Sequence, residues 1–279
     1  MKAKLIFLAI LLLFSFITII LYSRYIGTSG LVIKEYPIKN NKIASHFHGL
    51  KIVHLSDIHY NKVINSSRLE QIITKINQLE PDIIFLTGDL LDQETNEEDQ
   101  LSNLLMTMNA SLGKYMIEGN HDQDSKNWKK IAENGGFIIL ENEIELIYHQ
   151  GTEPIVLFGM SSNYDVNSAS EKYKTFENFL NINPNYRDLY KILLLHEPDY
   201  IEQFDYQKFD LILAGHSHGG QVKIPFLRPL FLPKGSKKYY NEYYQLETTD
   251  LYVSSGIGNS ILNLRLFNRP SFNFYRLNT

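Results

Sequence analysis

Residues 5–21 form a long apolar run that is interrupted only by Ser15 and Thr18. The hydroxyls of these two residues can hydrogen-bond to the backbone of the helix that carries them. A helix rises about 1.5 Å per residue, so the run is just long enough to span about 30 Å of hydrocarbon. The pattern therefore favours a transmembrane helix.

Two other interpretations of the run have to be weighed. A buried core helix would show a polar stripe, which is missing here, and a cleaved signal peptide would end in small residues, where this chain has Tyr22–Tyr25. We therefore expect residues 1–28 to be an uncleaved anchor. Lys2 and Lys4 favour an inside amino terminus, which predicts a single-pass cell-membrane protein with residues 29–279 as an extracytoplasmic domain.

Apolar runs that predict strands then alternate with segments of helical spacing. Residues 66–80 place an apolar side chain every three or four positions before Pro81, which predicts a helix. Strands alternating with helices imply βαβ units, whose sheets are covered on both faces and bind ligands beyond the carboxyl ends of the strands. Further helices are predicted at 97–108, 128–133 and near 171–180, three short strands within 137–158, a polar surface excursion over 161–188, and strands with turns after Gln221.

Polar side chains stand in Gly- or Ser-containing turns directly after the apolar runs. The strongest local pattern is Gly215–Gly219, where two histidines at alternate positions lie between glycines. Strand ends that converge would bring all these side chains to one site. The candidate ligands are Asp57, His59, Asp89, Asn120, His121, His196, His216 and His218.

Composition narrows the chemistry of such a site. The 279 residues are 44% hydrophobic and 21% charged, which is typical of a globular protein with one large or two small domains. The net charge of -4 gives no electrostatic case for nucleic-acid binding, so we expect no nucleic-acid partner. The chain has no cysteine, which excludes thiolate metal sites, disulfides and cysteine nucleophiles.

Carboxylate, imidazole and amide ligands without thiolate suit Mn, Fe or Zn better than Ca or an electron-transfer copper. The candidates outnumber the ligands that one ion needs, so two divalent metal ions sharing a carboxylate fit better. Paired metals support in-line displacement at phosphorus, in which an acidified water attacks and both ions stabilise charge on the phosphoryl oxygens.

Five ordered motifs, DIH, GDLLD, GNHD, LLLHEPD and GHSHGGQV, resemble the calcineurin-like metallophosphoesterase family over about residues 48–279. The chain is most similar to bacterial membrane-associated phosphohydrolases, which share the GHSHGGQ form of Gly215–Gln221 and an element like Tyr252–Gly258. The resemblance implies an α/β fold, the four-layer αββα sandwich, which agrees with the alternation of strands and helices.

The same resemblance implies a role for each motif residue. His121 matches a histidine that is not a ligand but contacts the substrate phosphate or protonates the leaving group, and we expect Asp122 to orient it. Apart from the resemblance, Asp92 is a candidate to support a metal ligand, but we favour a solvated or helix-capping role for it. The implied metal ligands are Asp57, His59 and His218 for the first ion, Asn120, His196 and His216 for the second, and Asp89 bridging both.

The sequence therefore predicts a membrane-anchored phosphohydrolase that cleaves a phosphoester or pyrophosphate bond with metal-activated hydroxide. The anchor makes a lipid-linked or envelope phosphate a plausible substrate. A nuclease-type phosphodiesterase is the alternative enzyme, and a non-catalytic metal-binding scaffold the alternative from another class. The acidic balance and the anchor disfavour the first, and the full ligand set disfavours the second.

One further segment, residues 223–244, mixes lysines and an arginine with phenylalanines and tyrosines. It suits an aromatic and basic lip that touches lipid head groups or an anionic substrate. A β-hairpin with ordinary surface lysines is the alternative.

Overall fold

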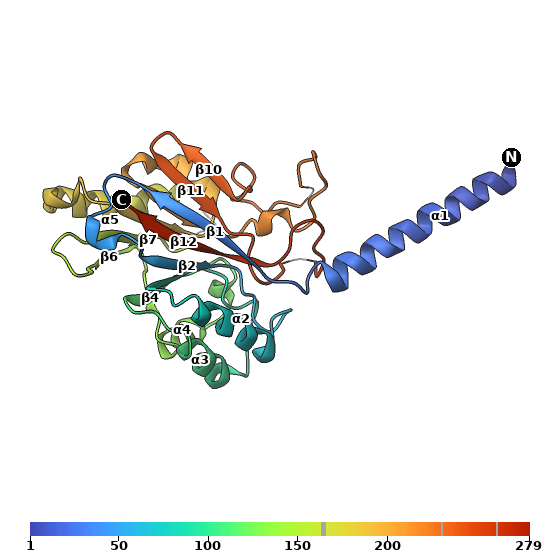
Figure 1. Ribbon diagram of the computed structural model, residues 1–279, viewed down its shortest axis with the longest axis horizontal. Helices are drawn as coiled ribbons and strands as arrows, with labels where there is room; N and C mark the ends of the chain where they lie inside the picture. Colours follow the sequence, from blue (N-terminus) through green and yellow to red (C-terminus); the bar gives the residue numbers. More distant parts are fainter. Residues whose placement is uncertain (163–165, 230, 261) are drawn as a thin grey trace.

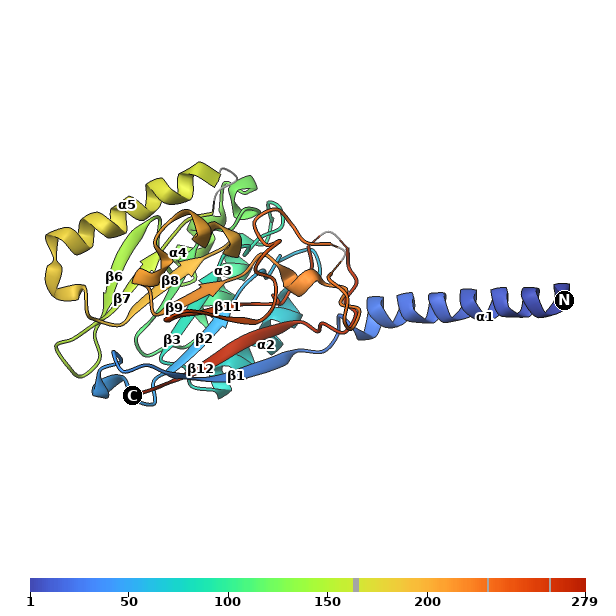
Figure 2. The same ribbon diagram turned by 90° about the horizontal axis from the view of Figure 1, so that it is seen from above.

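A computed structural model describes residues 1–162, 166–229, 231–260 and 262–279. Two six-stranded sheets stack against each other (Figures 1 and 2). The first has the order β1 (Val32–Lys39), β12 (Ser271–Asn278), β2 (Lys51–Leu55), β3 (Ile83–Thr87), β4 (Gly113–Ile117) and β5 (Ile138–Ile139). The second has the order β10 (Tyr243–Leu246), β11 (Thr249–Val253), β9 (Leu211–Ala214), β8 (Lys191–Leu195), β7 (Ile155–Gly159) and β6 (Glu143–Ile147).

Three apolar clusters hold the layers together. One lies between the sheets and includes Phe85, Leu157 and Leu213. A second joins the first sheet to the outer helices α2 (Ser66–Gln78), α3 (Glu98–Met106) and α4 (Trp128–Asn134), and a third joins the second sheet to α5 (Val166–Ile182). The predicted four-layer αββα sandwich is confirmed.

The central strands run parallel and end at a common edge. In the first sheet Leu55 pairs with Leu86, and Thr87 pairs with Ile117. In the second, Leu195 pairs with Ala214, which also pairs with Val253. Because these registers align the carboxyl ends, the loops that follow β2, β3, β4, β8, β9 and β11 open onto one edge of the double sheet.

Helix α2 shows how local sequence produces a layer. Asn65 begins it, because its side chain accepts a hydrogen bond from the backbone N–H of Arg68 at 3.0 Å. Leu69, Ile72, Ile73 and Ile76 are all buried on the face that meets the first sheet. The helix predicted at residues 66–80 is confirmed, as are those that begin near 97 and 128.

The helix predicted near 171–180 is confirmed and is longer than predicted. The surface excursion predicted over residues 161–188 is wrong, and residues 163–165 lie outside the described part of the chain. Helix α5 has 17 residues and packs Ala169, Tyr173, Phe176 and Leu180 onto the second sheet. These apolar side chains recur every three or four positions, but the many polar residues between them conceal the period.

The strands predicted directly after Gln221 are also absent from the described residues 223–229 and 231–242, and so is the hairpin alternative for this segment. Proline stands at 225, 229 and 233, where it lacks the N–H that a strand ladder needs. Strands resume only at β10, which pairs with β11.

Helix α1 (Lys2–Leu21) projects away from the sandwich, and none of its side chains is buried (Figure 1). It is long and apolar enough to cross a membrane, and the core-helix interpretation is excluded. A π-helical turn, Tyr22–Ile26, follows it.

The π-helical turn is fixed to the domain by its backbone. The carbonyl of Ser23 accepts from Arg265 N–H at 2.9 Å, and the side chain of Arg24 donates to the carbonyl of Asn263 at 3.3 Å. A Cβ on Gly27 would lie 1.8 Å from the carbonyl oxygen of Arg265, so glycine is required for this approach.

The packing of α5 on the second sheet predicts that two alanine variants of this helix differ in stability. Phe176→Ala should lower the free energy of unfolding by about 3–5 kcal/mol, because the ring is fully buried against Phe158 and Phe209. Ile182→Ala, at an exposed position of the same helix, should change it by less than about 0.5 kcal/mol. Chemical denaturation of the full chain in detergent measures both, and equal losses would contradict this packing.

Candidate metal centre

The structure brings the seven predicted metal ligands together at the aligned strand ends. Two come from the loop after β2 and one from each of the loops after β3, β4 and β8, and the last two follow β9. All are buried. They are Asp57 and His59, Asp89, Asn120, His196, and His216 and His218.

Backbone strain marks five of these seven residues. Their φ angles are positive: Asp57 53°, His59 47°, Asp89 56°, His216 65° and His218 46°. Non-glycine residues adopt this left-handed region in only a few per cent of cases, at a cost of about 1–3 kcal/mol each. Such strain clusters at functional sites, where the surrounding structure holds side chains in one orientation.

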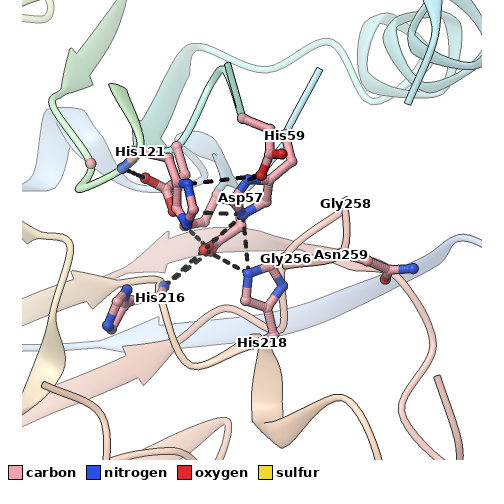
Figure 3. A network of polar contacts seen from close by, with 12 residues as sticks. Asp57, His59, His121, His216, His218, Gly256, Gly258 and Asn259 are labelled. Carbon is pink, nitrogen blue, oxygen red and sulfur yellow. Dashed lines mark hydrogen bonds and ion pairs between the residues drawn. The ribbon is translucent and has the colours of Figure 1, made fainter. Parts of the chain in front are cut away.

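The first ligand group contains Asp57, His59 and His218, whose ligand atoms all lie within 4.8 Å of one another. His218 Nε2 is 3.3 Å from Asp57 Oδ1 and 3.2 Å from His59 Nε2. Figure 3 shows these three side chains pointing toward one another. The other oxygen of Asp57, Oδ2, accepts from Ser56 Oγ at 2.5 Å and from His216 N–H at 3.0 Å, which fixes the carboxylate.

The second group contains Asp89, His196 and His216. His196 Nε2 lies 3.3 Å from Asp89 Oδ2 and 3.1 Å from the amide oxygen of Asn120. Asp89 Oδ2 is also 3.6 Å from His59 Nε2 in the first group. One carboxylate oxygen therefore faces both groups, which is the arrangement that a shared ligand requires.

Backbone carbonyls fix two of the imidazoles. His196 Nδ1 donates to the carbonyl of Thr87 at 2.7 Å, and His216 Nε2 donates to the carbonyl of Lys234 at 2.8 Å. Because a carbonyl only accepts, each of these nitrogens carries a proton, which leaves the opposite nitrogen of each ring as the one that can bind a cation. Both histidines are thus prepared to bind a cation.

Asp92 faces a third imidazole, a supporting role that the sequence analysis ranked below solvation or helix capping. Its Oδ1 lies 3.1 Å from His59 Nδ1, 3.8 Å from His121 Nδ1 and 2.9 Å from Lys62 Nζ. These contacts to His59 and Lys62 outweigh partial burial and lower the pKa of Asp92 to about 2. Its position at the end of the GDLLD motif is the sequence pattern that could have identified it.

Asp122 was predicted to orient His121, and the hydrogen bonds that its side chain makes are to backbone groups. Its buried carboxylate accepts the backbone N–H groups of Asp89 at 2.8 Å, Gly119 at 2.9 Å and Leu91 at 3.1 Å. It therefore joins the loop after β3 to the loop after β4, and Asp92 is the carboxylate that faces His121. The loops are close, because a Cβ on Gly88 would lie 2.5 Å from the Cα of Gly119.

His121 lies at the edge of this cluster and is partly exposed. Its backbone N–H donates to Asp89 Oδ1 at 2.8 Å, and its ring meets His59 edge-on with centroids 4.9 Å apart. This places an accessible imidazole beside both ligand groups, as Figure 3 shows for His59 and Asp57.

Burial and charge oppose one another in the centre. Burial alone would raise the pKa of Asp89, but His196, His59 and His121 outweigh it and lower that pKa. Burial alone would lower the pKa of His196, and Asp89 raises it well above its usual value. Asp122 has a pKa raised to about 7 by burial and by the Asp89 carboxylate. The centre therefore stabilises positive charge near Asp89.

The donor set fits divalent metal ions. Lone pairs on His59 Nε2 and His218 Nε2, 3.2 Å apart, repel each other unless a cation or a proton lies between them. Two buried carboxylates supply compensating negative charge, and imidazole with carboxylate and amide oxygen suits borderline metals.

Removing the support that Asp92 gives to His59 should weaken metal binding. Asp92→Asn is expected to lower the affinity of the first group by about 10–100-fold, because an imidazole without its oriented partner is a poorer ligand. Calorimetric titration with Mn²⁺ measures the change. Glu94→Gln, which removes an exposed carboxylate two residues away, should leave the affinity unchanged, and equal effects in both variants would contradict this role.

Comparison with known proteins identifies relatives along most of the chain. The metallophosphoesterase YkuE of Bacillus subtilis is 31% identical over 269 residues, which cover 92% of this chain and 88% of YkuE. YkoQ of the same organism is 30% identical over 242 residues, 82% of this chain and 83% of YkoQ. The UDP-2,3-diacylglucosamine pyrophosphatase LpxG of Chlamydia muridarum is 25% identical over 287 residues, 81% of this chain and 83% of LpxG.

The sequence profile of the calcineurin-like phosphoesterases matches residues 50–220. This range contains every loop that contributes a candidate ligand. The chain therefore belongs to the calcineurin-like phosphoesterase family and is a metal-dependent phosphoester hydrolase.

Proposed function

We propose that the chain hydrolyses a phosphoester or pyrophosphate bond at a dinuclear metal centre. The observation that carries this proposal is the position of Asp89 Oδ2, which lies within 3.6 Å of a ring nitrogen in each ligand group. The first ion would be held by Asp57, His59 and His218, the second by Asn120, His196 and His216, and Asp89 would bridge them.

Mn, Fe or Zn would suit this ligand set, which combines imidazole nitrogen with carboxylate and amide oxygen. When bound, such a pair supplies Lewis acidity and an acidified water for in-line attack at phosphorus. The chain's own contribution is to fix the ligands: carbonyl and carboxylate partners orient three imidazoles, and the strained loops set the directions of five side chains.

His121 is the residue that we assign to the leaving group. Its backbone is held by Asp89, its Nδ1 faces Asp92, and Nε2 lies on the opposite side of the ring. An imidazole held in this way can give its proton to the departing oxygen. Asp92 would position the ring, while Asp122 would act on the loops and not on the proton.

We place this activity at a membrane. Residues 1–28 would form the anchor and residues 29–279 an extracytoplasmic phosphoesterase domain in a single-pass cell-membrane protein. Support comes from α1, which is fully exposed and apolar. The relative LpxG is named for a diacylated pyrophosphate substrate, which agrees with a phosphorylated, lipid-linked substrate for this chain.

The bridging role of Asp89 can be tested by charge removal. Asp89→Asn should abolish metal-dependent turnover, with a loss larger than the about 10–100-fold expected for removing a partner of a ligand. The protein is stripped and reloaded with Mn, Fe, Zn or Mg, and kcat/KM is measured for an aryl phosphomonoester and an aryl phosphodiester. Asp99→Asn, at an exposed position of α3, is the matched control. Unchanged turnover in Asp89→Asn would reject the shared-ligand arrangement.

Leaving-group chemistry tests His121. His121→Ala should lower kcat by about 10²–10⁴-fold for an alkyl ester, whose departing oxygen needs a proton, and by much less for a nitrophenyl ester. Metal content should stay at the wild-type value. Equal losses for the two esters would show that His121 binds phosphate and does not act as the acid.

A further inference from the structure

An apolar cavity adjoins the proposed metal centre. It has a volume of about 330 Å³, which lies within the range of small-molecule binding sites, about 300–1,000 Å³. Ser217 and the candidate ligand His218 are part of its lining. Most of the remaining wall is hydrocarbon, supplied by Val222, Phe231, Leu232, Pro233 and Leu262. A ligand of the metals can therefore extend directly into an apolar space.

A polar group inside this lining has no partner. Gln221 borders the cavity, and among the described residues its buried Nε2 has no hydrogen-bond acceptor. Its backbone also has a positive φ of 49°. An unpaired buried donor is costly unless a ligand supplies the acceptor, and an ester or phosphoryl oxygen would do so.

The cavity opens onto an exposed apolar patch. Phe231 and Leu262 line the cavity and are exposed themselves, so they mark its mouth. Ile224, Phe226, Leu227 and Phe267 are also exposed large hydrophobic side chains, and they line a second surface hollow. Val222 of the cavity precedes Lys223 of this hollow in the chain. We call the six exposed hydrophobic residues the apolar rim. Exposed apolar side chains that gather around neighbouring segments of the chain indicate an interaction site.

Two members of the apolar rim are held outward against backbone preference. Phe226 has a φ of 67° and Phe267 a φ of 52°, a region that bulky residues rarely adopt. Both side chains are largely exposed. Lys223 and Arg228 line the same surface hollow as Phe226 and Phe267. Apolar side chains mixed with basic ones are typical of surfaces that contact the head-group region of a bilayer.

The apolar rim adjoins the end of α1. Leu262 and Phe267 flank Asn263 and Arg265, which hydrogen-bond to the π-helical turn that follows this helix. In both views the loops that carry the apolar rim lie at the end of the domain from which α1 projects (Figures 1 and 2). A bilayer crossed by α1 would meet this end of the domain first.

We propose that the cavity binds a hydrocarbon chain of the substrate, and that the substrate is a membrane lipid with a phosphoester or pyrophosphate head group. This inference rests on the hydrolase function proposed above. The apolar rim docks on the bilayer, the chain passes from the bilayer between Phe231 and Leu262, and the phosphate lies at the centre beside His218. Because the loops that carry the cavity mouth and the apolar rim lie at the end of the domain from which α1 projects, a lipid of the same membrane is the occupant that we infer.

Binding of alkylphosphonates tests the cavity independently of turnover. The full chain, loaded with Mn²⁺ in phosphatidylcholine nanodiscs, is titrated with ethylphosphonate and decylphosphonate in a calorimeter. Affinity should rise with chain length, by up to about fourfold for each methylene that is fully buried. Leu262→Asp and Phe231→Asp, both at exposed positions, should reduce the preference for decylphosphonate at least about tenfold and leave ethylphosphonate affinity unchanged.

Ile182→Asp is the matched control, because it puts the same charge at an exposed apolar position on α5. Decylphosphonate partitions into the nanodisc equally in all samples. A difference between variants therefore reports only the loss of chain binding in the cavity. Equal chain-length preference in Leu262→Asp, Phe231→Asp and the wild type would overturn the proposal, since the chain would then lie elsewhere. Absence of any preference in the wild type would also overturn it and indicate a soluble substrate.

Turnover of the aryl esters on the same samples separates this inference from the hydrolase function. Turnover without chain-length preference would reject the cavity proposal and retain the hydrolase. Chain-length preference without turnover would retain the hydrocarbon site and reject the hydrolase. Phosphatidic acid placed in the nanodisc should inhibit aryl-ester turnover in the wild type and not in Leu262→Asp. Inhibition by decylphosphonate alone would overturn the membrane lipid as the source.

Discussion

The Asp122 carboxylate accepts hydrogen bonds from three backbone N–H groups and so holds two strand-end loops in one position. One loop carries Asp89 and Asp92, and the other carries Asn120 and His121. Both ligand groups and the proposed acid therefore depend on a carboxylate that contacts none of the reacting atoms. Its burial is possible because the three N–H groups replace the water that it loses.

The strained backbone of the five ligands with positive φ lowers the stability of the folded protein. Each left-handed residue costs free energy that the two packed sheets must supply, and a bound cation offsets part of it by joining the side chains. The strained ligand residues thus lie at one edge of the sheets, where a bound metal would offset part of the cost. The strands that the structure describes have no non-glycine residue with positive φ. Metal binding and folding should consequently be coupled.

The sequence predicted those parts of the molecule whose determinants are local. The apolar period of residues 66–80 defines α2, and the apolar runs before Asp57, Asp89 and His216 define strands whose ends must meet. Helix α5 was underestimated because its buried residues are separated by Asn, Glu and Lys, so its amphipathic face is visible only against the second sheet.

Contacts across loops were the other kind of feature that the sequence could not define. Asp92 and Asp122 are both acidic residues in or beside a motif, and their spacing alone does not show which of them contacts an imidazole. Only the approach of the loops after β3 and β4 shows that Asp122 meets backbone N–H groups while Asp92 meets two imidazoles. The sequence shows the prolines at 225, 229 and 233, but it does not show the surface hollows that these prolines line.

Arg265 connects the end of α1 rigidly to the domain. The residue is fully buried, and its guanidinium donates to the carbonyls of Ser255, Gly256 and Gly258, while its own N–H binds Ser23. The backbone N–H of Gly258 in turn donates to the carbonyl of Asp57 at 2.7 Å. With α1 in a bilayer, this short rigid path fixes the stand-off height of the metal centre. An enzyme held in this way would search a plane by lateral diffusion, and for the membrane lipid proposed above its encounter rate would follow the surface density of the substrate and not its bulk concentration.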